Sequence, residues 1–265
     1  MSARNCKKSP IFFVLLTFFT SVIFTSNGRA GELNASDLLT IDSVYDKAKA
    51  EFELYARTTY AELNDTSLNY WAFQQGLIGY LNLEKQNELK RRDILTIVDF
   101  SKPSNVKRMY IIDLCKNEII YRTIVAHGVN SGGLYARDFS NVANSHQSSL
   151  GFYVTTTTYS GKFELALRID GMEFSNSHAN SRGVVIHAAK YATYEYLEKN
   201  ACLGRSFGCP ALPFDNFEKV VDWIKEGTCF FIYYPNRTYQ QNSKYLNSKD
   251  YLADFVYPDT YACQH

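Results

Sequence analysis

The pattern of side chains changes at Arg92, and this change constrains the fold more than any other feature of the sequence. Downstream of Arg92 the chain is a succession of short runs rich in β-branched and aromatic residues, separated by turn residues, which predicts strands. None of these runs is followed regularly by a helical pattern, so we expect a mixed or antiparallel β-sandwich or barrel rather than a doubly wound sheet. The predicted strands are Ile94–Phe100, Met109–Leu114, Ile119–Ala126, Gly151–Tyr159, Phe163–Ile169, Val184–His187 and Thr228–Tyr234.

Upstream of this point the spacing of apolar residues is helical. Apolar side chains recur with a helical period over Ser43–Leu63 and again over Ser67–Leu83, which predicts a helical hairpin. One late helix is predicted after Asp215, which can cap it, with Glu218 completing a capping box and Gly227 ending the helix. The predicted fold class is therefore mainly β, and α+β overall, with an N-terminal helical hairpin and one late helix.

The first thirty residues have the features of a secretory signal. Arg4, Lys7 and Lys8 form a basic start, Ile11–Phe24 is uncharged, and small residues around Ala30 suit a signal peptidase. An uncleaved membrane anchor is the alternative, but the apolar run is shorter than the roughly twenty residues that span a bilayer. We expect a signal peptide over residues 1–30, export to the periplasm or beyond, and no stable membrane insertion after cleavage.

The rest of the chain divides by pattern into a helical segment (31–92), a β-rich domain (93–235) and a polar, aromatic tail (236–265). The full sequence has 28 basic and 27 acidic residues. Four of the basic residues and no acidic one lie in the predicted signal, so the mature chain would carry a net charge of about −3, which disfavours a nucleic acid partner.

Cysteine counting gives a first chemical indication. Removal of the signal, with Cys6, leaves an odd number of cysteines in an oxidising compartment, so at least one thiol stays unpaired. The sequence does not fix the pairing: a bridge from Cys115 to Cys229 is plausible, and a bridge from Cys202 to Cys209 would make a redox switch. We expect Cys209 to stay unpaired. The five remaining cysteines are Cys115, Cys202, Cys209, Cys229 and Cys263.

The most unusual segment is 205–210, which places Cys209 directly after a glycine in a turn. A turn can present a thiol to solvent, whereas an apolar strand buries it. Gly208 allows the backbone to curve so that N–H groups face a developing oxyanion. A structural disulfide cysteine is the alternative interpretation. His187 ends the predicted strand Val184–His187, at a position where a general base can emerge, although a structural histidine would also fit there.

The other histidines are weaker candidates. His127 ends a predicted strand and precedes a polar loop that includes Ser131, whereas His146 and His178 lie among Asn and Ser residues. No close pair of the Cys-x-x-Cys or His-x-x-x-His kind is present, so we expect no metal site. No glycine pattern suited to phosphate binding is present either.

These residues resemble a known family. The string Val185-Ile186-His187, followed after a loop by Gly204-Arg205-Ser206-Phe207-Gly208-Cys209-Pro210-Ala211, is similar to the active-site signature of the YkuD-like murein L,D-transpeptidase catalytic domain. The resemblance covers roughly residues 94 to 234 and is to a variant branch, because Phe207 stands where the commoner pattern has a second histidine and Ala211 where it has Asn or Arg. Further matching segments are 97–101, 125–132, 139–141, 148–151 and 167–171.

The resemblance implies specific roles. Cys209 matches the acylated nucleophile, His187 the base, Ser206 the turn hydroxyl, and Gly208 with Cys209 the N–H groups of the oxyanion hole. The carbonyl of Ala188 would orient the imidazole.

Three further residues are expected to bind substrate, namely His127, Ser131 and Arg205. His127 is also a possible spatial substitute for the second histidine of the commoner pattern.

The implied reaction is acyl transfer on peptidoglycan. The thiolate would attack an L-to-D bond in a tetrapeptide stem, release D-Ala, and pass the acyl group from a thioester to an amine. The implied partner is the stem peptide of the cell wall, and no cofactor is needed. Two alternatives stay open: an L,D-carboxypeptidase or endopeptidase on the same scaffold, and an inactive wall-binding module.

Overall fold

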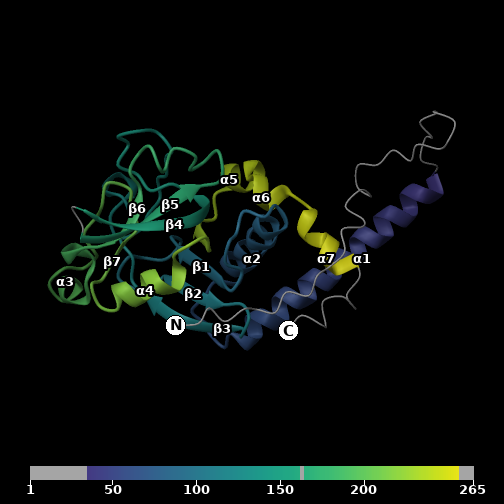
Figure 1. Ribbon diagram of the computed structural model, residues 1–265, viewed down its shortest axis with the longest axis horizontal. Coiled ribbons are helices and arrows are strands. Elements are labelled where there is room, and N and C mark those ends of the chain that lie inside the picture. The colour runs from purple at the N-terminus through teal and green to yellow at the C-terminus, as the bar shows by residue number, and fades with distance from the viewer. Residues whose placement is uncertain (1–34, 162–163, 257–265) are drawn as a thin grey trace. The chain divides into compact units, whose positions relative to one another are not determined.

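The computed structural model describes residues 35–161 and 164–256, so the predicted signal peptide and Cys263 lie outside the described residues (Figure 1). The chain divides into two compact units, residues 53–251 and a smaller unit of residues 1–52 with 252–265. The smaller unit contains the first part of α1 (Ala35–Glu62) and α7 (Ala253–Val256). Within it, the rings of Phe52 and Phe255 meet edge to face at 5.4 Å between centroids.

The larger unit is built on one mixed sheet of eight strands, in the order β3-β2-β1-β8-β4-β5-β6-β7. All seven predicted strands are present, which confirms the mainly β prediction. The neighbours pair antiparallel except at β1–β8 and β6–β7, which pair parallel. The strands are β1 (Ile94–Asp99), β2 (Met109–Asp113), β3 (Glu118–Thr123), β4 (Gly151–Gly161), β5 (Glu164–Gly171), β6 (Val185–Ala188), β7 (Ala211–Leu212) and β8 (Cys229–Tyr233).

The two ends of this sheet are joined by the segment that follows β3. Ala126 bridges Ala211 in β7, and Gly128 bridges Ser206 just before β7. Backbone hydrogen bonds link Ala126 and Ala211 in both directions, at 2.8 and 3.4 Å. The segment after β3 therefore closes the sheet beside the 205–210 turn, and the barrel-like part of the prediction is confirmed.

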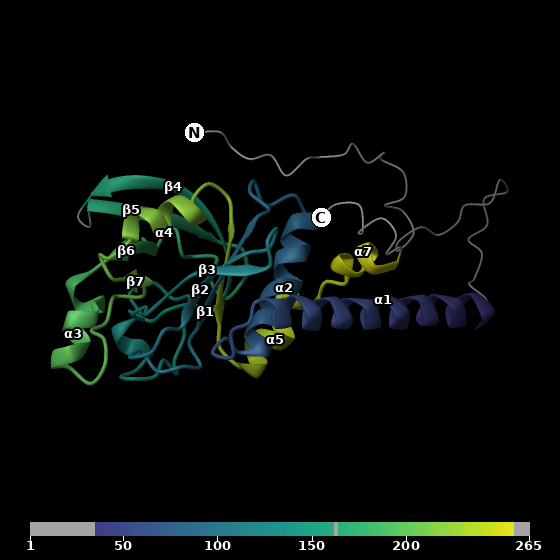
Figure 2. The same cartoon turned by 90° about the horizontal axis from the view of Figure 1, so that it is seen from below.

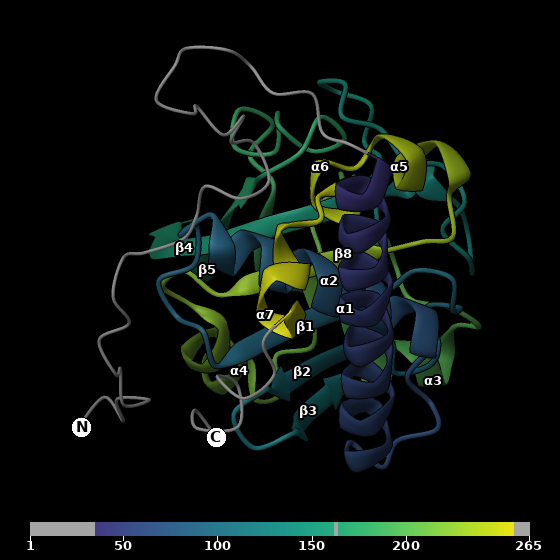
Figure 3. The same ribbon diagram turned by 90° about the vertical axis from the view of Figure 1, so that its right-hand side faces the viewer.

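Helix α2 (Tyr70–Lys85) packs closely on the sheet, and Figure 3 shows it in front of β1. Asn69 caps the helix by accepting from the Trp71 N–H at 2.9 Å. A Cβ on Gly79 would lie 1.9 Å from the ring of Phe152 in β4, so this position excludes any side chain. The glycine lets the helix axis approach the sheet, where Phe152 stacks on Phe231 of β8 at 4.1 Å.

The late helix is α4 (Phe217–Ile224), but its predicted start is wrong by one residue. The N-cap is Asn216 rather than Asp215, it has a left-handed backbone with φ of 61°, and it makes no side-chain cap. A capping box needs an extended cap residue, so the box with Glu218 does not form. Val220, Val221 and Ile224 are buried, as the apolar stripe requires.

Shorter helices complete the described part of the chain. The short helix α3 lies toward the β7 side of the unit in both Figure 1 and Figure 2. No helix within residues 35–161 and 164–256 is long and apolar enough to cross a bilayer. The elements not yet given are α3 (Tyr194–Lys199), α5 (Arg237–Asn242), α6 (Lys244–Asn247) and the 3-10 turns η1 (Val129–Ser131), η2 (Lys190–Ala192) and η3 (Asp250–Leu252).

The segment after β8 is folded, although the sequence pattern marked it only as a polar tail. The carboxylate of Glu173 is buried and accepts from Tyr239 Oη at 2.7 Å and from the Phe152 N–H at 3.0 Å. It also accepts from the Ser243 hydroxyl. These contacts attach α5 and α6 to the end of β4, because the oxygens of a buried carboxyl group need hydrogen-bond donors to replace water.

Candidate active site

Strand pairing brings the predicted base and the predicted nucleophile turn together. In the parallel β6–β7 pair, His187 lies opposite Ala211, two residues after Cys209. The His187 N–H donates to the carbonyl of Pro210 at 3.4 Å. Residues 22 positions apart in the sequence thus share one edge of the sheet. This placement follows from β7, a two-residue strand that the sequence did not predict.

The Cys209 thiol is partly exposed and held by backbone groups of the strand next to it. The Val185 N–H donates to Sγ at 3.4 Å, and Sγ donates to the carbonyl of Gly183 at 3.7 Å. Burial raises the pKa of the thiol, while the Val185 N–H and the charge of Arg182 lower it. The net shift is upward, so the resting group is a neutral thiol that needs a base to become a nucleophile.

His187 has the tautomer that a general base requires. Its ring is buried, and Nδ1 lies 3.0 Å from the carbonyl oxygen of Ala188. A carbonyl only accepts, so Nδ1 carries the proton and Nε2 keeps its lone pair. Burial lowers the pKa of His187, and the bond to Ala188 opposes this shift. The imidazole is therefore neutral at pH 7.

Ser206 closes the turn that carries the thiol. Its hydroxyl donates to the carbonyl of Cys209 at 2.6 Å and accepts from the Gly208 N–H at 3.0 Å. The Gly208 N–H is therefore already used within the turn, and the expected oxyanion hole stays a prediction. The Cys209 N–H donates to none of the residues that the structure describes, so it is the donor of this pair that can serve a developing oxyanion.

Gly208 is needed at its position for two separate reasons. Its φ is 121°, in a region that L-residues rarely adopt. A Cβ there would lie 2.7 Å from the Gln147 carbonyl oxygen and 3.2 Å from Arg182 Nη2. We predict that Gly208→Ala slows alkylation of Cys209 at least about tenfold and destabilises the protein by roughly 1–3 kcal/mol.

The matched control for this prediction is Gly133→Ala, which has ordinary φ and whose Cβ would meet nothing closer than 3.9 Å. Urea unfolding and timed alkylation of both variants test the prediction. Equal stability and equal thiol reactivity in the two variants would contradict it.

His127 lies in the core rather than on the surface. Its Nδ1 accepts from Arg108 Nη2 at 2.8 Å, and its Nε2 lies 3.2 Å from the carbonyl of Gly132, which fixes the proton on Nε2. Burial and the nearby charge of Arg108 lower the pKa of His127 to about 4. Both ring nitrogens are used and the side chain is fully buried. The ring therefore positions the 132–133 loop, and its contact with substrate stays a prediction.

The other two predicted substrate residues differ in access. Ser131 is buried, and its hydroxyl accepts from the Ser148 N–H at 2.9 Å, so it joins two loops. Arg205 is exposed, and its Nη1 donates to the Gly132 carbonyl at 3.4 Å. Of the three residues, Arg205 is the one that a ligand can reach without rearrangement.

Three groups near the thiol were missed from the sequence. The phenol of Tyr191 has its pKa raised to about 12, by burial and then by the charge of Cys209. The ring of Phe207 is 72% exposed and stacks on His146 at 4.3 Å between centroids. Arg182 reaches the turn from the loop before β6. Only the stacked pair carried a sequence signal, because Phe207 replaces the histidine of the commoner motif.

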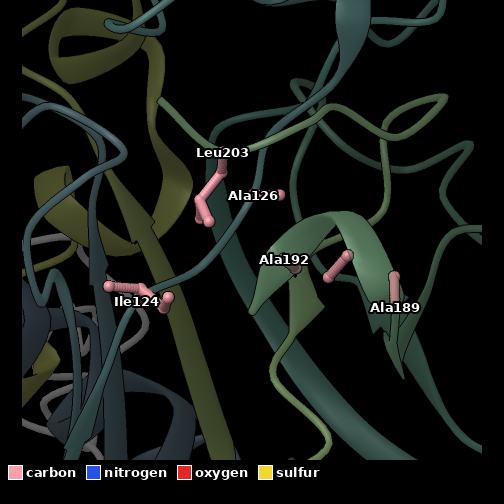
Figure 4. Close-up of a cluster of buried hydrophobic side chains, with 6 residues drawn as sticks. Ile124, Ala126, Ala189, Ala192 and Leu203 are labelled. Carbon is pink, nitrogen blue, oxygen red and sulfur yellow. The ribbon is translucent and has the colours of Figure 1, made fainter. Parts of the chain in front are cut away.

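A small apolar cluster holds the loop that joins His187 to the nucleophile turn. Figure 4 shows Ile124 and Ala126, from the segment after β3, near Ala189, Ala192 and Leu203. Ala211 of β7 completes the cluster, and Tyr191 and Leu197 pack against it. The cluster fixes both ends of the 189–203 loop, so His187 and the turn keep their spacing.

Cys202, Cys209 and Cys229 are free thiols. Cys229 is buried in β8, where desolvation strongly raises its pKa, and the suggested bridge to the exposed Cys115 is wrong. Within the described ranges no three His, Cys, Asp or Glu side chains gather in a way that would hold a metal ion.

Comparison with protein families gives one match over most of this unit. A family model described as the L,D-transpeptidase catalytic domain matches residues 64–233. Comparison with curated protein sequences gives no match.

Solved structures with a similar fold include three bacterial proteins. An L,D-transpeptidase from Mycobacterium smegmatis is 12% identical, with a TM-score of 0.35 over 54% of this chain and 59% of its own. One from Mycobacterium tuberculosis is 15% identical, with a TM-score of 0.33 over 54% and 58%. The helical cell shape determining protein Pgp2 from Campylobacter jejuni is 14% identical, with a TM-score of 0.37 over 69% and 61%. The chain covers less than two thirds of the length of each.

Proposed function

Because the chain belongs to the L,D-transpeptidase catalytic domain family, we propose that it is a peptidoglycan L,D-transpeptidase that uses Cys209 as its nucleophile and His187 as its general base. The observation that carries the proposal is the β6–β7 register, which puts the strand of His187 against the residues after Cys209. A neutral thiol and a neutral imidazole with its proton on Nδ1 form the resting state of a cysteine acyltransferase.

The first half-reaction forms a thioester. As Sγ of Cys209 attacks the carbonyl carbon of the L-to-D bond, His187 Nε2 takes the thiol proton. The carbonyl electrons move to oxygen, and the Cys209 N–H donates to this oxyanion. When the intermediate collapses, the carbon–nitrogen bond breaks and His187 gives its proton to the amine of the departing D-Ala.

The second half-reaction regenerates the thiol. An acceptor amine attacks the thioester carbonyl while His187 takes a proton from it. The carbon–sulfur bond then breaks and His187 returns the proton to Sγ. No metal or organic cofactor enters either step, because the thiol, the imidazole and the backbone N–H supply nucleophile, base and electrostatic stabilisation.

Replacement of the base should slow the chemistry of the thiol. We predict that His187→Ala slows alkylation of Cys209 at pH 7 by roughly tenfold or more, in line with the usual contribution of a general base of about 10² to 10⁴. Circular dichroism checks that the variant folds, because the ring is buried. An unchanged alkylation rate in a folded variant would leave His187 a structural residue.

A hydrolase on the same scaffold is the alternative, because water can replace the amine in the second half-reaction. Purified tetrapeptide muropeptides incubated with the mature protein separate the two functions by mass spectrometry. A cross-linked dimer supports the transpeptidase, and a tripeptide without dimer supports an L,D-carboxypeptidase. Unchanged muropeptides would contradict both and leave a wall-binding module.

The proposed substrate places the protein outside the cytoplasm. Stem peptides are found in the cell wall, and the predicted signal peptide over residues 1–30 would direct the chain there. We therefore propose a periplasmic or secreted, wall-associated protein. Detection of the mature N-terminus in the periplasmic or culture fraction tests this localisation.

A further inference from the structure

Arg182 binds four acceptors on one loop. Nη1 donates to the carbonyl of Ser140 at 2.8 Å and to the hydroxyl of Ser149 at 2.6 Å. Nη2 donates to the hydroxyl of Ser145 at 3.2 Å and to the carbonyl of Gln147 at 2.6 Å. A guanidinium has two N–H groups on each of these nitrogens, so all four are used. Arg182 therefore clamps the 140–149 loop and has no Nη donor left for substrate.

Among the described residues, no carboxylate is paired with the charge of this guanidinium. All four of its acceptors are neutral carbonyl or hydroxyl oxygens. No Asp or Glu within the described residues forms an ion pair with it. Partial burial lowers the pKa of Arg182, but the group stays protonated in a protein. The partly buried positive charge of Arg182 is thus hydrogen-bonded to neutral carbonyl and hydroxyl groups.

The guanidinium also lies directly against the nucleophile turn. A Cβ on Gly208 would be 3.2 Å from Arg182 Nη2 and 2.7 Å from the Gln147 oxygen that Arg182 holds. The turn therefore rests on the arginine and on the loop that the arginine clamps. The hydroxyl of Ser148, in the same loop, donates to the Gly208 carbonyl at 3.2 Å.

We propose that Arg182 is a positioning residue for the acyl transfer, which holds the 140–149 loop under the Gly208–Cys209 turn and supplies the positive charge that stabilises the Cys209 thiolate. The role of the thiolate in acyl transfer rests on the proposed function. The stabilisation of the thiolate by Arg182 does not depend on that function. The cation that stabilises the thiolate is then the guanidinium of Arg182, which keeps its charge at every physiological pH. His187 is neutral at rest and transfers the protons.

The other ionisable groups around this pair are few. Tyr153 lies within electrostatic range of Arg182 and is buried, so it stays a neutral phenol. Burial and the Cys209 thiolate raise the pKa of Tyr191, so its phenol is also neutral near pH 7. His187 lies on β6 beside the turn, and His146, in the clamped loop, stacks on Phe207 of the turn. Burial lowers the pKa of His187, whereas Arg182 keeps its charge at every physiological pH, so the effects of these two groups differ in their pH dependence.

The test compares Arg182→Gln with Arg182→Lys, and uses Arg122→Gln as the control for the loss of one positive charge. Arg122 is exposed on β3, and its partners are Asp65 and Ser67. The rate at which iodoacetamide alkylates the Cys209 peptide is followed against pH by mass spectrometry, because this neutral probe reports the thiolate fraction. The measurement needs no peptidoglycan, so a negative muropeptide assay would remove the proposed function and leave this inference standing.

We expect Arg182→Gln to move the midpoint of the alkylation profile upward by one pH unit or more. At a pH below the midpoints of both the wild type and the variant, this shift slows alkylation about tenfold or more. Arg182→Lys should have a midpoint close to that of the wild type, because Lys keeps the positive charge. Hydrogen exchange in residues 140–149 should become faster in this variant, because Lys does not make the four hydrogen bonds. Arg122→Gln should leave the profile unchanged.

An Arg182→Gln profile that superimposes on that of the wild type would overturn the proposal, as would an equal shift in Arg122→Gln. If Arg182→Gln does not fold, Arg182→Lys decides the electrostatic claim. A midpoint in Arg182→Lys one unit or more above that of the wild type would overturn it.

Discussion

Cys209→Ala should abolish formation of the acyl-enzyme and lower turnover of tetrapeptide muropeptides by at least about 10³-fold, because the proposed mechanism assigns the covalent step to this thiol alone. Cys229 is buried in β8 and cannot meet a substrate. Cys202 is partly exposed, but it lacks the Val185 N–H that holds the Cys209 thiol. The fold should survive, because the side chain of a turn cysteine contributes little to the core.

The matched control is Cys202→Ala, which changes the thiol at the other end of the same loop. It should keep turnover within about twofold, since it removes no group of the proposed mechanism. Product analysis of both variants, together with their circular dichroism, checks the prediction. Turnover retained in Cys209→Ala would contradict the assignment of the nucleophile.

Arg108→Met should be the most destabilising single change away from the thiol, at about 3–5 kcal/mol, because it breaks a buried polar network by removing one partner. The guanidinium is 0% exposed. It donates to the carbonyl of Val125 at 2.7 and 3.0 Å, to that of Lys102 at 2.8 Å, and to His127 Nδ1. Its carbon lies 4.8 Å from the ring centroid of Phe100.

The loss of the Arg108 guanidinium should also affect the active site. The carbonyl of His127 accepts from the Ser206 N–H at 3.0 Å, so displacement of the His127 backbone would disturb the nucleophile turn. We expect Arg108→Met to slow alkylation of Cys209 as well as to lower the urea midpoint.

Arg122→Met is the control, because the Arg122 side chain is exposed, and its partner Asp65 still accepts from the N–H and the hydroxyl of Ser67 when the ion pair is lost. An ion pair at the protein surface contributes roughly 1 kcal/mol or less. Urea unfolding measures the stability of both variants. Equal midpoints for Arg108→Met and Arg122→Met would show that the buried network does not stabilise the fold.

The sequence predicted the strands because burial sets their composition. Runs such as Ile94–Phe100 and Thr228–Tyr234 are almost wholly apolar, and β1 and β8 are buried along their whole length. By contrast, β7 has only two residues, which is too short for a recognisable hydrophobic period, and it is defined by its pairing with β6. The cap at Asn216 was missed because a left-handed cap residue uses backbone geometry rather than a side-chain pattern.

The predicted site divides in the same way. His187 and Cys209 belong to local motifs, and a resemblance to a family could identify them. Arg182 lies among Asn, Ser and Gly residues, and its partners are 33 to 42 positions earlier in the chain, so nothing near it in the sequence marks its role. His127 was predicted from its place at the end of a strand, which does not distinguish a ring facing a groove from one facing Arg108.

The acyl-enzyme itself is the most direct test of the account. The mature protein is mixed with a disaccharide tetrapeptide, quenched in acid within seconds, and weighed intact by mass spectrometry. We predict an adduct equal to the donor less one D-Ala, mapped by peptide sequencing to Cys209 and removed by hydroxylamine, as a thioester requires. An adduct on another residue, or release of D-Ala at an undiminished rate by the Cys209→Ala variant, would contradict the account.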